Sequence, residues 1–143
     1  MVTYNTVEGG SYNPSVDLIQ KAGVVSSSPS QGIGYTTGAG GAVTQTTSKS
    51  TGVTLNAMCG TITMNNANLA TVTSVAFTLT NSYIAANDVV VVSIKSGATT
   101  NSYLVGVQAV AAGSCSINVY NLSGGTLGEA LVLNFAVIRG VAS

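Results

Sequence analysis

The feature that most constrains this chain is an alternation of apolar and polar residues that starts near Val43 and continues almost to the end. Successive side chains of a strand point to opposite faces, so a period of two predicts strands with one buried face. The alternating apolar residues are Val53 and Leu55; Ile62 and Met64; Val75, Phe77 and Leu79; Tyr103, Val105, Val107 and Ala109; Ile117 and Val119; and Leu131, Leu133, Phe135 and Val137. The pattern predicts about eight strands and no long helix.

Short polar segments separate these strands. They read NNAN, IAAND, SGATTN, AAGS and SGGTLG, which are sequences typical of tight turns. We therefore predict an all-β fold of two packed antiparallel sheets, a β-sandwich or jelly roll, whose strand order the pattern does not define. The run DVVVVSIK is almost wholly apolar and β-branched, which predicts a strand at the centre of a sheet with both faces covered.

Residues 1–34 follow a different pattern and are predicted to form an extended N-terminal arm before a β-sandwich domain at residues 35–143. Isolated apolar residues stand among NP, EGG, SSSPS and QGIG, which favour turns and breaks over regular periodicity. Within this arm SVDLIQKAGVV predicts one or two helical turns, with Ser15 as the N-cap and Gly23 as the stop.

Four residues in or beside the predicted arm are candidate interface residues, namely Tyr4, Tyr12, Ile33 and Tyr35. Tyrosine is enriched in protein interfaces because it offers a large apolar ring with a polar tip. The three later tyrosines, Tyr83, Tyr103 and Tyr120, are expected to be ordinary sheet residues.

The chain carries very little charge, which narrows its partners. Charged residues make up 6% of the sequence, against about 25% in ordinary globular proteins, and the formal net charge is zero. A weakly charged surface favours association, so we expect an assembled subunit. The four cations, Lys21, Lys49, Lys95 and Arg139, form no basic stripe, which argues against binding to nucleic acid or to anionic membranes. No leader or membrane-spanning pattern is evident, so synthesis in a cytoplasm is expected.

The residue types required for catalysis are scarce. There is no histidine, and the four carboxylates are Glu8, Asp17, Asp88 and Glu129. Asp88 and Glu129 lie at strand ends, where we expect solvated side chains, and an enzyme would need both in one cleft. We predict no enzymatic activity, and the lack of CxxC and DxDxDG patterns predicts no metal or cofactor.

Two further features have structural interpretations. GIGYTTGAGG lacks a GK[ST] sequence and a following helix, so its glycines are expected to let an extended segment pass close to another backbone rather than to bind phosphate. Cys59 and Cys115 are expected to be small, buried core residues with free thiols, because the chain is not cysteine-dense.

Several motifs together resemble a known family. They are GIGYTTGAGGAVTQTTSKSTGVTLN with CGTITMNNANLA, then VAFTLTNSYIAANDVVVVSIKSG, and finally AVAAGSCSINVYNLSGGTLGEALVLNFAVIRG. Covering roughly residues 32–140, they resemble a β-domain of structural proteins in tailed bacteriophages. The resemblance implies a non-enzymatic, assembled virion component. Similar domains occur in head decoration (cement) proteins and at the ends of tail-fibre or other tail-associated proteins.

The sequence contains neither a shaft-like repeat nor a coiled-coil heptad, which favours the decoration protein. The resemblance then implies a homotrimer that binds the major capsid protein on the outside of the virion, after synthesis in the host cytoplasm. The alternative is a tail-associated receptor-binding β-domain that recognises a host glycan. The absence of Trp and an aromatic content of 6% weigh against it.

Overall fold

The computed structural model describes residues 34, 35 and 38–141. The chain divides into one unit at Met1–Gly34 and another at Tyr35–Ser143, and almost all described residues belong to the second. The predictions for Tyr4, Tyr12, Ile33 and the helical turns at 15–23 lie outside the described residues.

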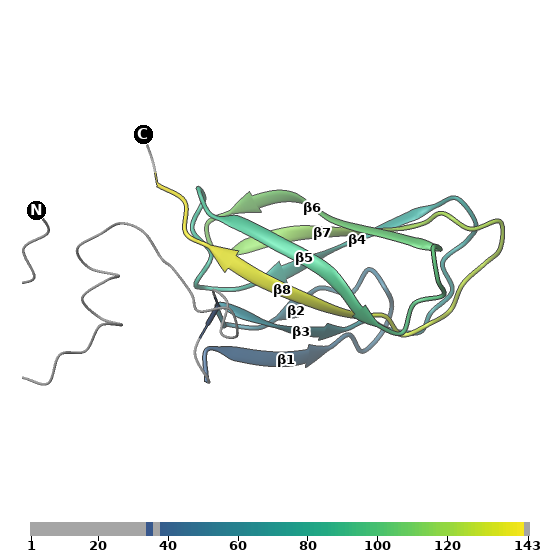
Figure 1. The fold of residues 1–143 in the computed structure, drawn as a ribbon, viewed down its shortest axis with the longest axis horizontal. Helices are drawn as coiled ribbons and strands as arrows, with labels where there is room; N and C mark the ends of the chain where they lie inside the picture. The colour runs from purple at the N-terminus through teal and green to yellow at the C-terminus, as the bar shows by residue number, and fades with distance from the viewer. Residues whose placement is uncertain (1–33, 36–37, 142–143) are drawn as a thin grey trace, which may run out of the picture. The chain divides into compact units, whose positions relative to one another are not determined.

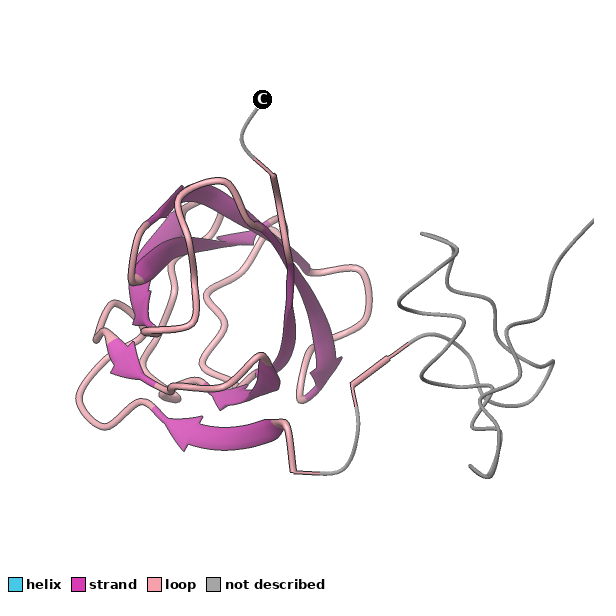
Figure 2. Ribbon diagram, turned by 90° about the vertical axis from the view of Figure 1, so that its left-hand side faces the viewer, coloured by secondary structure: helices cyan, strands magenta, loops and turns pink. Residues whose placement is uncertain are grey.

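Eight strands and no helix are found in the described part of the chain. Their bounds are β1 Gly40–Thr44, β2 Val53–Thr54, β3 Cys59–Thr63, β4 Ser74–Thr80, β5 Val89–Ser96, β6 Tyr103–Ala111, β7 Ser114–Asn121 and β8 Val132–Ile138. Sheet A has the order β1-β3-β8-β5 and sheet B the order β2-β4-β7-β6 (Figure 1). Figure 2 shows the two sheets facing each other around a common interior. The predicted all-β, sandwich-like fold is confirmed.

The prediction of purely antiparallel sheets is wrong at two strand pairs. β1 runs parallel to β3, and β2 runs parallel to β4. The reason is that the first four strands alternate between the sheets, so neighbours within a sheet are separated by one strand in the other sheet. After two crossings the chain returns in its original direction, whereas a hairpin would reverse it.

The inward-facing residues of both sheets form one apolar core. Its fully buried apolar members are Ile62, Met64, Leu79, Ile117, Val119, Leu131, Leu133 and Val137. All of them belong to the alternating runs, so the face assignments for these runs are confirmed. Burial of each such side chain contributes about 1.5–3 kcal/mol relative to exposure.

Strand β5 is not central, contrary to prediction. It is an edge strand of sheet A, where its hydrogen-bonded neighbour is β8. Val90 is buried, but Val89 and Val91 on the outer face are 56% and 48% exposed. The β-branched run favours a strand wherever it lies, and the pattern alone does not reveal whether the second face is covered.

Strand β6 contains a register shift that the alternation did not predict. The pairing with β7 is irregular between Val107 and Ala109, so Ala109 is exposed and Val110 packs against the core. A bulge adds a residue on one strand and reverses the faces beyond it. The predicted shared face therefore holds for Tyr103, Val105 and Val107 but not for Ala109.

A close approach of backbones occurs between β1 and β3, but the glycine that it requires is Gly60, outside the predicted segment GIGYTTGAGG. Gly41 pairs with Gly60, and a Cβ on Gly60 would lie 2.5 Å from the Gly41 carbonyl oxygen and 3.1 Å from Cε1 of Phe135. A side chain at Gly60 would therefore separate the strands. Cys59 is half-buried and Cys115 buried, and both thiols are free, as predicted, although Cys59 is not in the core.

Candidate functional site

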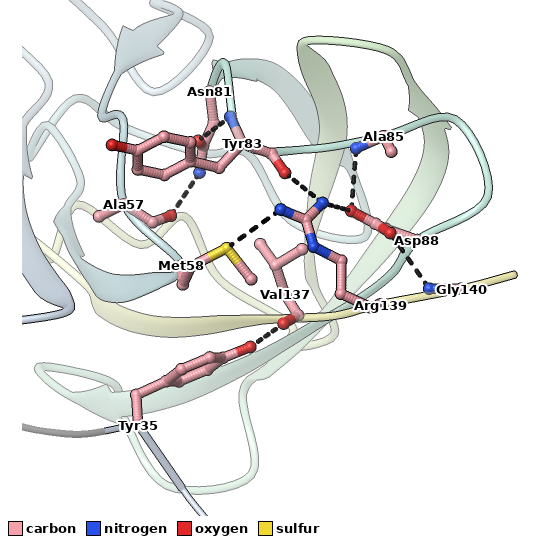
Figure 3. Close-up of polar contacts among 10 residues, drawn as sticks. All are labelled: Tyr35, Ala57, Met58, Asn81, Tyr83, Ala85, Asp88, Val137, Arg139 and Gly140. Carbon is pink, nitrogen blue, oxygen red and sulfur yellow. Dashed lines mark hydrogen bonds and ion pairs between the residues drawn. The ribbon is translucent and has the colours of Figure 1, made fainter. Parts of the chain in front are cut away.

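The candidate site lies at the end of sheet A where β5 begins and β8 ends. Val89 pairs with Ile138 in the antiparallel ladder, which places Asp88 beside Arg139 although they are 51 residues apart in sequence. Nη1 of Arg139 lies 2.8 Å from Oδ2 of Asp88 (Figure 3). Strand pairing, and not a local motif, therefore creates this ion pair.

Asp88 is the buried member of the pair. Its side chain is 0% exposed, and it accepts hydrogen bonds from the backbone N–H groups of Ala85 at 2.9 Å and Gly140 at 3.1 Å. The bond from Ala85 holds the pKa of the Asp88 carboxyl below its ordinary value, helped by Gly140 and Arg139 and opposed by burial. The prediction of a solvated Asp88 is wrong, because the turn before β5 folds the carboxylate back onto its own backbone.

Arg139 is the exposed member, with 56% of its side chain accessible. Besides the bond to Asp88, Nη1 donates to the Tyr83 carbonyl at 2.7 Å, and Nη2 lies 3.7 Å from the Met58 sulfur. These contacts orient the guanidinium plane. The Nε–H and one Nη2–H have no acceptor among the described residues, so they remain available to a partner.

Two exposed tyrosines flank this arginine. The ring of Tyr35 is held by its hydroxyl, which donates to the Val137 carbonyl, and the residue is 41% exposed. Tyr83 is 50% exposed and lies in the loop between β4 and β5, so the prediction of an ordinary sheet residue is wrong here. In Figure 3 Met58 lies between the two tyrosines, beside the Arg139 guanidinium.

A buried amide fixes the loops that carry these side chains. Asn81 is 0% exposed; its Nδ2 donates to the Ala57 carbonyl at 2.7 Å, and its Oδ1 accepts from the Tyr83 N–H at 3.0 Å. Asn81 thus ties the loop of Tyr83 to the residue that precedes Met58. The backbone that carries Tyr83 and Met58 is therefore held in place before any partner arrives.

We define the docking surface as Tyr35, Met58, Tyr83, Val89, Ile138 and Arg139. Val89 and Ile138 pair across the strands and are 56% and 54% exposed, which adds an apolar area on the outer face of sheet A at this end of the two strands. Tyrosine, methionine and arginine are the residues enriched in protein interfaces, while lysine and carboxylates are depleted there. The arrangement is suited to non-covalent protein recognition.

Of the four predicted interface residues, the structure places Tyr35 on this surface, and the other three are outside the described residues. Met58, Tyr83 and Arg139 were not predicted. Their signal in the sequence is weak, because each lies in a loop or just beyond a strand and they meet only through the strand order.

The opposite end of the sandwich holds a buried lysine. Lys49 is 3% exposed, and its Nζ donates to the carbonyl of Asn65 at 2.7 Å and to that of Glu129. Burial lowers the pKa of Lys49, and the negative charge of Glu129 opposes this shift. Nothing in the Ser- and Thr-rich segment around this lysine predicts that it is internal.

Glu129 is half-buried at the same end, so the prediction of a solvated side chain holds only in part here. Its carboxylate accepts hydrogen bonds from the hydroxyls of Thr99 and Tyr103. These bonds hold the pKa of Glu129 below its ordinary value, and burial together with Glu129 raises the pKa of Tyr103. Asp88 and Glu129 are separated by the length of β5, so the fold does not bring the two acids into one cleft.

Across residues 34–35 and 38–141, no group of three His, Cys, Asp or Glu side chains is placed to hold a metal ion. The same residues include no helix of the length and apolarity needed to cross a membrane.

Comparison of the chain with protein-family models, with curated proteins and with solved structures gave no match.

Proposed function

We propose that this protein is a capsid decoration (cement) protein, which binds the outside of a bacteriophage head and stabilises contacts between major capsid subunits. The sequence resemblance suggests the virion, and the docking surface supplies a place for the contact. The observation that carries the proposal is the group of exposed Tyr35, Tyr83 and Arg139 beside half-buried Met58, in which hydrogen bonds hold the Tyr35 ring, the Arg139 guanidinium and the backbone of Tyr83.

Preorganisation explains how such a surface binds without a large area. Asp88 and the Tyr83 carbonyl fix the guanidinium of Arg139, so little side-chain freedom is lost when a partner docks. The free N–H groups of Arg139 would meet carbonyl or carboxylate oxygens of the capsid protein. Val89 and Ile138 would then bury their apolar side chains beside this polar contact.

Stabilisation of the shell follows from mass action. A protein that binds the assembled capsid but not the separated subunits shifts the equilibrium toward the capsid. Many copies of a modest contact multiply this effect. A homotrimer on the capsid surface is proposed by analogy with cement proteins, whose symmetry matches local threefold positions; the low charge of the chain is compatible with self-association.

The second candidate is a tail-associated receptor-binding domain. It is favoured by a hollow on sheet B where a tyrosine ring lies beside two amide side chains. The two candidates differ in how many copies a particle carries.

The deciding experiment is the copy number of this protein in purified particles, measured by quantitative mass spectrometry against the major capsid protein. A count in the hundreds, in fixed ratio to the capsid subunit, is the expected result. A count of a few to a few tens would overturn the decoration proposal and place the protein on the tail. Absence from particles would overturn both.

A further inference from the structure

A hollow of about 180 Å³ lies on the outer face of sheet B, between β6 and β7. Leu104 pairs with Tyr120 and Gly106 with Asn118, so these four residues share the face. Gly106 creates the depression, because it has no side chain and nothing lies within 4 Å of the position a Cβ would occupy. The hollow is therefore walled by side chains and floored by backbone.

The aromatic wall of the hollow is held in one orientation. The Tyr120 hydroxyl donates to the Val72 carbonyl at 3.1 Å. Val72 has φ 50°, a left-handed conformation that β-branched residues rarely adopt, and its side chain is 62% exposed. Buried Asn121 donates to the carbonyls of Leu69 and Ala70 and so anchors the segment that leads to Val72. Such strained residues cluster at binding sites.

Two amide side chains complete the lining. Gln108 is exposed at the β6 bulge, and Asn118 is half-exposed on β7. No hydrogen bond joins either amide to another of the described side chains or backbone groups, so both can donate and accept. No charged residue lines the hollow. An anionic or cationic ligand would find no counter-charge there.

We propose that this hollow binds one ring of a neutral saccharide. The apolar face of the ring packs on Tyr120 and Leu104, and its hydroxyl groups bond to the amides of Gln108 and Asn118. The volume is close to the roughly 150 Å³ of a cavity that holds one benzene molecule, which suits one sugar ring and is too small for a peptide helix. The site lies on the other sheet from the docking surface and does not depend on the decoration proposal.

The test uses the full-length chain, labelled with ¹⁵N and titrated with N-acetylglucosamine and the methyl glycosides of glucose, galactose and mannose at tens of millimolar. We expect at least one sugar to shift the backbone signals of Gly106, Gln108 and Asn118 selectively. The dissociation constant should be of the order of 1–10 mM, as expected for one small ring on an open site.

Gly106→Val is the decisive variant, because it fills the hollow with a residue that strands favour and whose Cβ has no atom within 4 Å. It should weaken sugar binding at least tenfold without lowering the melting temperature. Gln108→Ala should weaken binding less. Thr78→Val is the matched control, since Thr78 is exposed on the same face of β4 but outside the lining, and it should leave binding unchanged.

Three results would overturn the proposal. One is the absence of selective shifts with all four sugars. Another is unchanged binding in Gly106→Val. The third is a pair of observations: the original chain binds no sugar, and Gly106→Val sediments differently from it. This result would identify the face as a contact between copies of the protein. Copy number per particle is independent of all three, so failure here leaves the decoration proposal intact.

Discussion

Each end of the sandwich carries a cation bonded to backbone carbonyls, but the cation is buried at one end and exposed at the other. At one end Lys49 is 3% exposed. The carboxylate of Glu129 at this end is half-buried and accepts hydrogen bonds from two hydroxyl groups. At the other end the carboxylate of Asp88 is 0% exposed and Arg139 is 56% exposed. A buried cation that donates to the carbonyls of two separate segments holds those segments together. An exposed cation that a buried carboxylate holds in position is available to a partner. We therefore assign a stabilising role to the Lys49 end and a binding role to the Arg139 end.

The largest expected effect is on stability at the buried end. Lys49→Met keeps most of the side-chain volume but leaves the carbonyls of Asn65 and Glu129 without their donor. Two hydrogen bonds from a charged group together contribute about 3–6 kcal/mol. Because the substitution also removes the desolvation cost of the buried ammonium, we expect unfolding free energy to fall by about 3 kcal/mol. Urea denaturation followed by circular dichroism measures this change.

Lys95→Met is the matched control, because Lys95 is exposed on β5. Its stability should stay within about 0.5 kcal/mol of the original chain. If Lys49→Met were equally neutral, the buried lysine would not be a structural element, and the contrast between the ends would fail. Arg139→Met should lose less stability than Lys49→Met, because Arg139 is itself exposed and the buried Asp88 carboxylate keeps its hydrogen bonds from two backbone N–H groups.

The next effect is on binding at the exposed end. Arg139→Met and Tyr83→Ala should each weaken binding to purified capsids about tenfold or more, as expected for residues at the centre of an interface. Arg139→Lys should be intermediate, since it keeps the charge but loses the planar fork that reaches Tyr83 and Met58 together. Co-sedimentation with capsids that lack the protein measures the affinity.

Leu122→Ala provides the control for capsid binding, because Leu122 is 52% exposed but is not on the docking surface. Its affinity should equal that of the original chain. A loss of binding in Leu122→Ala, with normal binding in Arg139→Met, would move the interface to another part of the sandwich.

Both ends should contribute to the loss of stability in acid. The pKa of Asp88 is lowered mainly by the Ala85 N–H, and that of Glu129 mainly by the Thr99 hydroxyl. A lowered carboxyl pKa stabilises the fold above the ordinary values of 3.8 and 4.5, and this stability is lost as pH falls through them toward the lower folded values. We expect unfolding free energy to decrease from about pH 5 downward.

Asp88→Asn and Glu129→Gln separate the two contributions. In each variant the unfolding free energy should fall less steeply as the pH is lowered, because unfolding takes up at most about one proton fewer than in the original chain. The measurement is the pH dependence of urea denaturation between neutral pH and the acid limit of folding. A slope that neither substitution changes would show that the acid response arises elsewhere in the chain.

The fold could be predicted from the sequence where it depends on local patterns, and not where it depends on contacts between distant residues. Alternation correctly assigned the inward faces of β3, β4, β7 and β8, because burial of one face is a local, periodic property. It failed for β5, whose central position was inferred from the β-branched run Val89–Val92, and at the bulge of β6. Strand order and register shifts depend on partners that are distant in sequence.

The candidate site was predictable only in part for the same reason. Tyr35 could be proposed from residue type alone. Arg139 and Asp88 could not be paired, since their contact depends on the register of β5 with β8. The internal position of Lys49 likewise requires carbonyls from Asn65 and Glu129, which the strand order brings together.

The smallest expected effect concerns the two thiols, one of which is partly exposed and the other buried in the core. Cys59 is half-buried on the outer face of sheet A, whereas burial raises the pKa of the Cys115 thiol to about 11. At pH 8 only about one Cys115 in a thousand would be a thiolate, the form that reacts. Ellman's reagent should therefore modify Cys59 in the folded protein and Cys115 only after unfolding. A reducing agent should leave the melting temperature unchanged, because neither thiol is paired; a clear decrease would contradict the free-thiol assignment.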